Sequence, residues 1–253
     1  MSAETRYTIN KIAEVTILFW ILKIIATTLG ETLGDFIAQT LNLGYVIGLG
    51  ATGVLLIGLL IAQIRAKHYH PALFWAAIVA TTTAGTEISD LMDRTLGLGY
   101  LWGSVILTVG LLATLMYWYR REGHLSVDPI VKRDTEIKFW VAVVFSNSLG
   151  TAFGDMLVDV VGLSFWQGAI VCAGVIAAVL ALHYTKTVND IVLFWLAFIF
   201  TRPFGATFGD LLTKPTDHGG LDLGTYNAAG ISVVLMAVLI WVSMRLRRAR
   251  GID

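Results

Sequence analysis

Four aspartates occupy equivalent positions in this sequence, and they are the residues with the clearest potential for chemistry. Each ends a stretch that begins with Phe-Trp and passes through a glycine-rich turn; they are Asp35, Asp90, Asp155 and Asp210. Each follows its tryptophan by 15 residues, and successive aspartates are 55, 65 and 55 residues apart. Because the surrounding segments are apolar, these carboxylates would lie in hydrocarbon, where a charge costs about 2.5–3.5 kcal/mol and normally faces a partner or water.

Further polar side chains share a helical face with these aspartates, at offsets of three or four residues or one turn more. They are Glu31, Glu87, Asp159, Thr207, Thr27, Thr28, Lys23, Thr82, Asn147 and Arg202. Hard divalent cations prefer carboxylate, hydroxyl and carbonyl oxygens as ligands. We therefore expect cation binding at Glu31, Asp35, Glu87, Asp90, Asp155 and Asp210. Metal coordination is expected to centre on Glu31, Asp35, Glu87 and Asp90.

The same residues also permit a purely structural interpretation, in which intramembrane ion pairs neutralise the carboxylates. Asp90 is followed four residues later by Arg94, and Asp210 by Lys214. Lys23 lies on the stripe of Glu31 and is expected either to pair with it or to extend toward the cytoplasm. Only two of the four repeats carry a cation beside the aspartate, which favours one asymmetric site over a symmetric ring of four.

The composition indicates that lipid is the solvent for most of the chain. Of 253 residues, 56% are hydrophobic and 14% charged, and the mean hydropathy is +0.73. Soluble domains are about 45–50% apolar and about 25% charged. The formal net charge of zero gives no indication of a nucleic-acid partner. The single Cys172 excludes an internal disulfide or a multi-cysteine metal site.

The apolar stretches predict an all-α integral membrane protein, because each is long enough to cross a hydrocarbon layer of about 30 Å. The eight expected spans are 13–39, 44–65, 72–94, 99–119, 137–160, 165–184, 188–212 and 224–246. They form a single membrane domain, 1–253, of four two-helix repeats at about 8–66, 68–121, 132–186 and 187–248. The polar stretch around 122–136 separates two halves, 1–121 and 132–253.

The distribution of basic residues predicts the orientation. Fourteen of the 18 Lys and Arg residues lie on the side of the N-terminus and the even-to-odd connections, and only Arg94 and Lys214 lie on the other. The positive-inside rule then places both termini in the cytoplasm of a cell with an inner membrane. Since each repeat contains an even number of helices, the four repeats are expected to be parallel and related by an axis along the membrane normal.

The stretch Thr27-Thr28-Leu29-Gly30-Glu31-Thr32-Leu33-Gly34-Asp35, with its repeated Gly-x-x-x-Gly-Asp motif, resembles a bacterial family known only as uncharacterised multi-pass membrane-anchored proteins. It is more loosely similar to the Glu-x-Gly-Asp signature of Mn²⁺/Ca²⁺ cation exporters. That signature has Glu three residues before Asp, whereas Glu31 is four before Asp35. In the second repeat the spacing is three, but Ser89 replaces the glycine. The likeness implies similar cation chemistry at Glu31, Asp35, Glu87 and Asp90.

These observations favour a transporter of cations, with a divalent metal as substrate rather than resident cofactor and with export or proton coupling as weaker expectations. The expected partners are the lipid bilayer and the transported cation, and oligomers are compatible with the sequence. A competing interpretation is a non-transporting membrane module that binds a lipid, a pigment or a partner protein. An intramembrane aspartyl protease needs Gly-x-Gly-Asp, and Thr32, Ala152 and Thr207 stand where its first glycine would be. We therefore do not expect an enzyme.

The orientation can be tested with topology reporters fused after residue 253 and within the connection 122–136. Both should report the cytoplasm, because the basic residues are concentrated on that side of the predicted spans. A reporter inserted between Lys214 and Leu223 serves as the opposite-side control. A periplasmic signal at either of the first two positions would contradict the orientation.

Overall fold

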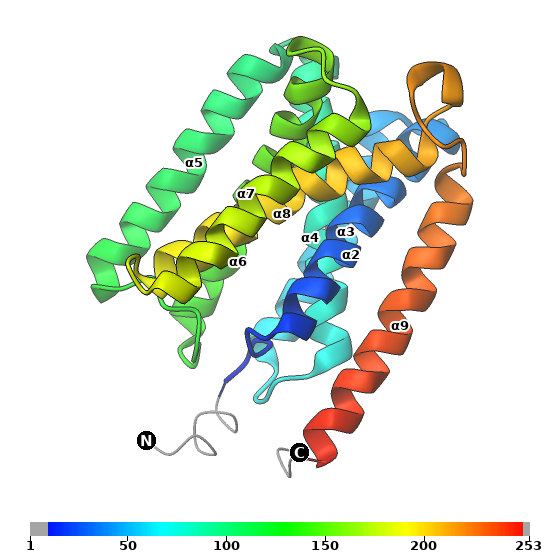
Figure 1. Ribbon diagram of the computed structural model, residues 1–253. Coiled ribbons are helices and arrows are strands. Elements are labelled where there is room, and N and C mark those ends of the chain that lie inside the picture. The colour runs from blue at the N-terminus through cyan, green and yellow to red at the C-terminus, as the bar shows by residue number, and fades with distance from the viewer. Residues whose placement is uncertain (1–9, 250–253) are drawn as a thin grey trace.

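The computed structural model describes residues 10–249, which fold into eight long helices (Figure 1). They are α2 (Ile17–Asp35), α3 (Gly44–Arg65), α4 (Pro71–Asp90), α5 (Gly99–Glu122), α6 (Arg133–Asp155), α7 (Phe165–Thr185), α8 (Asp190–Thr213) and α9 (Thr225–Ala249). Five-residue π-helices, Phe36–Thr40, Leu91–Thr95 and Met156–Val160, directly follow α2, α4 and α6. A short 3₁₀-helix, Thr216–His218, follows α8. The all-α prediction is confirmed, and the predicted spans coincide closely with these helices.

The first helix of each repeat belongs to an inner ring. In this ring α2 contacts α4, α4 contacts α6, α6 contacts α8, and α8 returns to contact α2. These four helices carry most of the buried polar residues, so the polar stripe predicted from the sequence faces the centre of the bundle. The start of α2 and the end of α9 lie at the same end of the bundle (Figure 1).

Glycine allows the inner helices to approach closely, and the same contact recurs at all four interfaces. A Cβ atom added to Gly30 would lie 2.1 Å from the Thr82 hydroxyl. At Gly205 it would lie 2.4 Å from the Thr27 hydroxyl. Gly85 packs in the same way on Asn147, and Gly150 on Arg202. Small residues are the usual means of close helix packing in membranes, and here they bring four equivalent positions to one level of the ring.

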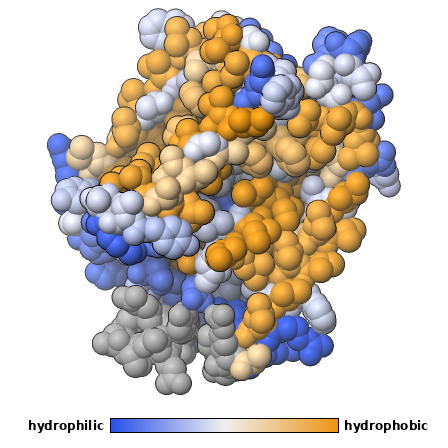
Figure 2. All heavy atoms as spheres, in the orientation of Figure 1, coloured by the Kyte–Doolittle hydropathy of each residue, from blue (hydrophilic) through white to orange (hydrophobic). Residues whose placement is uncertain are grey.

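The second helix of each repeat lies outside the ring, but it packs mainly on the inner helix of the following repeat. Thus α3 packs on α4, α5 on α6, α7 on α8, and α9 closes the circle against α2. Their outward faces are apolar, with exposed residues such as Val54, Val109, Ile170 and Val234. Figure 2 shows hydrophobic residues over most of the middle of one face, with hydrophilic residues gathered toward its lower end.

Seven helices in the described part of the chain are long and apolar enough to cross a membrane. The predicted eighth span, α4, is not among them. This helix carries a run of polar residues, Thr81, Thr82, Thr83, Thr86, Glu87, Ser89 and Asp90, all buried inside the bundle. Its hydropathy is low because it is surrounded by other helices and does not need an apolar surface of its own.

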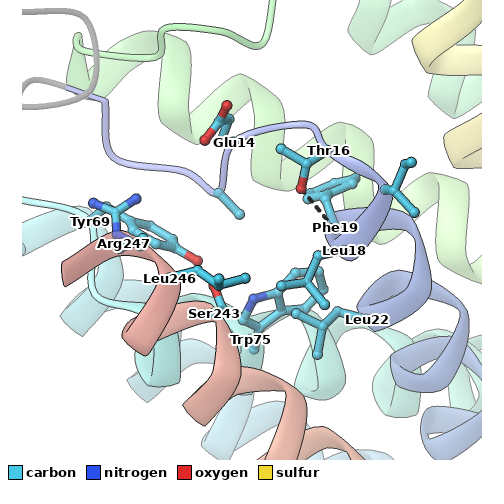
Figure 3. Close-up of a pocket in the computed structure, with 12 residues that line it drawn as sticks. Glu14, Thr16, Leu18, Phe19, Leu22, Tyr69, Trp75, Ser243, Leu246 and Arg247 are labelled. Carbon is cyan, nitrogen blue, oxygen red and sulfur yellow. Dashed lines mark hydrogen bonds between the residues drawn. The ribbon is translucent and has the colours of Figure 1, made fainter. Parts of the chain in front are cut away.

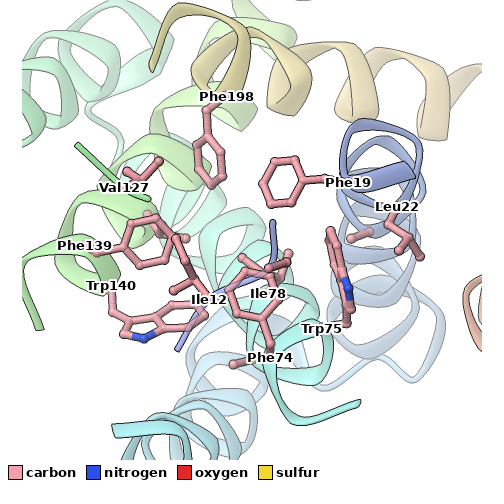
Figure 4. Close-up of a cluster of buried hydrophobic side chains, with 14 of the residues drawn as sticks. Ile12, Phe19, Leu22, Phe74, Trp75, Ile78, Val127, Phe139, Trp140 and Phe198 are labelled. Atoms are coloured by element: carbon pink, nitrogen blue, oxygen red, sulfur yellow. The ribbon is translucent and has the colours of Figure 1, made fainter. Parts of the chain in front are cut away.

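Aromatic side chains fill the ring near the start of the inner helices (Figure 4). Phe19, Phe74, Phe139 and Phe194 occupy the same position in the four repeats, and all are buried. Their neighbours Trp75, Trp140 and Trp195 are also buried, with tilted or edge-to-face ring contacts throughout. Such contacts are typical of well-packed aromatic clusters, so this level of the ring is closed by side chains.

The glycine contacts predict a clear difference between inner and outer glycines. Gly30→Ala should destabilise the protein by about 1–3 kcal/mol, because its Cβ would overlap Thr82 on the neighbouring helix. Gly50→Ala is the matched control, since a Cβ there would meet no atom within 4 Å. Thermal unfolding in detergent measures both. Equal melting temperatures for the two variants would contradict the packing described here.

Candidate functional site

Two cations divide the four repeated aspartates into pairs at the far end of the inner helices. Arg94 lies 3.0 Å from Asp90 on its own helix and 3.2 Å from Asp155 on the next. Lys214 repeats this arrangement, at 3.3 Å from Asp210 and 2.5 Å from Asp35. Both bases follow an aspartate by four residues, so the predicted ion pairs are formed. Each cation also reaches a second carboxylate on the next helix of the ring.

The Lys214 side of this layer holds an additional carboxylate. One oxygen from each of Glu31, Asp35 and Asp210 lies within 4.8 Å of the others, and all three residues are buried. Gln39 also donates a hydrogen bond of 2.5 Å to Asp35. No comparable carboxylate group with three members occurs elsewhere among residues 10–249. The four aspartates therefore form an asymmetric site, as the uneven distribution of cations suggested.

Arg202 lies in the centre of the ring, nearer to the start of the inner helices than the four aspartates are, and its side chain is fully buried. Its Nη2 donates to Glu31 Oε2 at 2.8 Å and to the hydroxyls of Thr86 and Thr151 at 2.6 Å each. In the repeat alignment Glu31, Thr86 and Thr151 are equivalent, and Ala206 is the fourth member. Side chains at three of these four equivalent positions therefore accept a hydrogen bond from Arg202.

Lys23 does not pair with Glu31, so that expectation is wrong. The two residues are eight positions apart, about 12 Å along a helix, and Arg202 takes the place next to Glu31. Lys23 is fully buried; its Nζ donates to Asn147 Oδ1 at 3.1 Å and lies 4.1 Å from the centre of the Phe198 ring. It places a second basic side chain in the interior of the ring.

The other predicted site residues are distributed around this centre. Glu87 faces α3, where its carboxylate accepts a hydrogen bond from Thr52, and is not part of the layer formed by Asp35 and Asp210. Asp159 is exposed and accepts a hydrogen bond of 2.7 Å from Tyr100. The hydroxyls of Thr27, Thr82 and Thr207 donate to backbone carbonyls, and Thr28 is buried.

Two cavities approach the ring from its opposite ends. A cavity of about 320 Å³ is lined by Asp155, Asp210, Arg94 and Lys214 and by His218 of the exposed loop after α8. The other, about 420 Å³, lies between the start of α2 and the end of α9 (Figure 3). There, apolar residues such as Leu22 and Trp75 separate it from the carboxylates. Only the first cavity gives direct access to the aspartate layer.

Lys214 is held as a cation by its neighbours. Partial burial by itself lowers the pKa of its ammonium, but the carboxylates of Asp210 and Asp35 more than offset this and raise the pKa well above its ordinary value. Lys214 therefore remains charged throughout the physiological pH range. Its Nζ occupies the space between two of the three clustered carboxylates.

The repeats are recognised by a known family profile. It matches residues 18–69, 73–124, 138–188 and 193–249, and each match contains one inner and one outer helix. The chain belongs to the DUF347 family. This family is described as a repeat of unknown function, so it confirms the fourfold repetition without indicating an activity. No curated protein and no solved structure matches the chain.

The pair of Arg202 and Glu31 can be tested by a double-mutant cycle. Arg202→Met should destabilise the protein by about 3–5 kcal/mol, because it leaves the buried carboxylate of Glu31 without its cation. The double variant Arg202→Met/Glu31→Gln should recover much of this loss. Lys186→Met is the control, because Lys186 forms an exposed pair with Asp190 at 3.7 Å and should show no measurable effect. Additive single effects would contradict a direct interaction.

Proposed function

We propose that this protein transports divalent cations across the inner membrane, with Glu31, Asp35 and Asp210 as the ion-binding carboxylates. The observation that carries the proposal is their grouping, with three oxygens within 4.8 Å at buried positions. Oxygens on opposite sides of a bound Ca²⁺ are separated by about 5 Å, since each lies about 2.3–2.6 Å from the ion. The group thus has dimensions suited to an ion of this class.

The membrane arrangement forms part of the proposal. The four two-helix repeats run parallel around an axis along the membrane normal, and α4 crosses the membrane as the eighth span. Support comes from the glycine contacts, which recur with the same register from Gly30–Thr82 around to Gly205–Thr27. Both termini lie in the cytoplasm according to the distribution of basic residues. The cavity beside Asp155 and Asp210 then opens to the outside.

Charge supports binding of a cation and not of an anion at this level. Arg94, Arg202 and Lys214 contact five carboxylates, those of Glu31 and the four repeated aspartates. Two negative charges are therefore left over. Carboxylates in excess of cations are expensive in a membrane interior unless they bind protons or ions. A single divalent cation would neutralise this layer.

Lys214 acts in this proposal as a tethered competitor of the ion. Its Nζ already bridges Asp35 and Asp210, so an entering cation must displace it. Displacement is geometrically simple, because Lys214 is the residue directly after α8 and its side chain is 26% exposed, beside the outer cavity. The lysine lowers the affinity for the ion, which assists release in a transport cycle.

Thermal shift measurements with Mn²⁺, Ca²⁺ and Mg²⁺ test the ion site. A bound ion at about 100 times its Kd should stabilise the wild type by about 2.7 kcal/mol. Asp35→Asn should abolish this stabilisation, and Lys214→Met should strengthen it, because the competitor is removed. Asp217→Asn, at an exposed position in the outer loop, is the matched control for loss of one carboxylate.

The Asp35→Asn and Asp217→Asn substitutions should affect cation flux into proteoliposomes in the same way as they affect thermal stabilisation by the ion. Wild type and Asp217→Asn should transport the stabilising ion, and Asp35→Asn should not. The proposal is refuted if none of the three ions stabilises the wild type and no flux is detected. Equal stabilisation of wild type and Asp35→Asn would place the ion elsewhere.

A further inference from the structure

Among the described residues, Lys23 is the buried basic residue of the inner ring that contacts no carboxylate. Its ammonium nitrogen has one hydrogen-bond partner, the amide oxygen of Asn147, and faces the Phe198 ring. Its equivalents in the other repeats are Ile78, Val143 and Phe198, all buried and apolar. The environment of Lys23 is therefore neutral on three sides.

The charged group nearest to Lys23 is another cation. Arg202 lies one helical turn beyond Phe198 on α8 and acts electrostatically on Lys23. The carboxylates of α4 and α6 belong to other parts of the bundle, with Asp90 and Asp155 in the outer layer and Glu136 paired with Lys11. The buried residues of α9, which also packs on α2, are Ala228, Ala229, Ser232 and Met236, and all are neutral.

The side chains of Arg202 and Lys23 respond differently to burial without a nearby carboxylate. A guanidinium keeps its charge in proteins, whereas a buried lysine readily gives up its proton. Two buried cations are costly when only one of them, Arg202, has a carboxylate partner, and the cost for the lysine disappears if its amine is neutral. A neutral amine still has N–H groups to donate to Asn147.

The charge balance then connects Lys23 with the carboxylate layer. With Lys23 neutral, the five carboxylates exceed Arg94, Arg202 and Lys214 by two charges, which one divalent cation cancels. When the cation leaves, two protons restore neutrality. The amine of Lys23, which is buried inside the same ring, is a base that can bind one of them.

We infer that Lys23 is the proton-carrying residue of this transporter: its amine is neutral while the divalent cation is bound and takes up one proton when the cation leaves. In this exchange the amine binds one proton and becomes an ammonium as one divalent cation is released. The state of the amine is a property of the fold, whereas the coupling rests on the proposed function. The two parts are therefore tested separately.

The protonation state is measured by solid-state nitrogen NMR of lysine-labelled protein in lipid bilayers near neutral pH. A neutral amine and an ammonium give resolved Nζ signals. The wild type should show one neutral-amine signal among its lysines, and the signal should be absent from Lys23→Met. It should persist in Lys186→Met, which removes a lysine with an exposed side chain. Absence of a neutral signal from the wild type, or its persistence in Lys23→Met, overturns the inference whatever the transport result.

The coupling is measured in proteoliposomes that report cation uptake and internal pH together. Lys23→Met should exchange one proton fewer for each divalent cation than the wild type, with thermal stabilisation by the cation retained. An unchanged proton ratio in Lys23→Met overturns the coupling. If the neutral signal is found but the wild type binds and moves no cation, the proposed function fails, and with it the coupling.

Discussion

The need to compensate a fully buried guanidinium at the centre of the bundle constrains the rest of the structure. Glu31, Thr86 and Thr151 supply acceptors to the Nη2 of Arg202 from three different helices, whereas its Nε and Nη1 have no hydrogen-bond partner among the described residues. These acceptors converge only if the inner helices pack closely and in register, which the glycines at the four interfaces permit. Removing the guanidinium alone would leave a buried carboxylate unpaired, so the ring and its charges depend on each other.

The four repeats share one backbone arrangement, but their side chains differ, so the charges around the ring have lower symmetry than the backbone. The position four residues after the aspartate is Gln39, Arg94, Asp159 and Lys214 in the four repeats. Only the second and fourth supply cations, and each bridges its own aspartate to the next around the ring. The inner layer breaks the remaining symmetry, because Glu31 stands on one side and Ala206 on the other. Repetition thus provides the geometry, and single substitutions make the arrangement of charges asymmetric.

The sequence predicted the helices well because membrane spans and repeats are local patterns. The expected span 44–65 coincides with α3, and the spacing of 15 residues from Trp to Asp placed all four aspartates at one level. The stretch 72–94 is also helical, but it divides into α4 and a π-helix at Leu91, and α4 is not among the helices apolar enough to cross a membrane. Its low hydropathy reflects burial by neighbouring helices, which a single-span argument cannot anticipate.

The contacts of the site were harder to predict because they join distant segments. Arg202 and Glu31 are 171 residues apart, and nothing in either span alone indicates the pair. Glu87 was grouped with Glu31 because both precede an aspartate, but one residue of offset turns a side chain by about 100° around the helix. In register Glu31 matches Thr86 and Glu87 matches Thr32, and this turns Glu87 toward α3. The ungapped alignment of the repeats therefore already indicated that Glu31 and Glu87 face in different directions.

The two ends of the ring differ in access, and this difference follows from the fold. The end that carries the repeated aspartates opens into a cavity lined by Asp155, Asp210 and Lys214. At the other end, Lys11 forms a buried ion pair with Glu136 and donates to the Ile64 carbonyl at 2.9 Å, while Ile12 is buried in the aromatic cluster. At the end where α2 begins, these contacts and the phenylalanine layer therefore separate the aspartates from the surface. Because each outer helix packs on the inner helix of the following repeat, these contacts join the four repeats into one continuous ring.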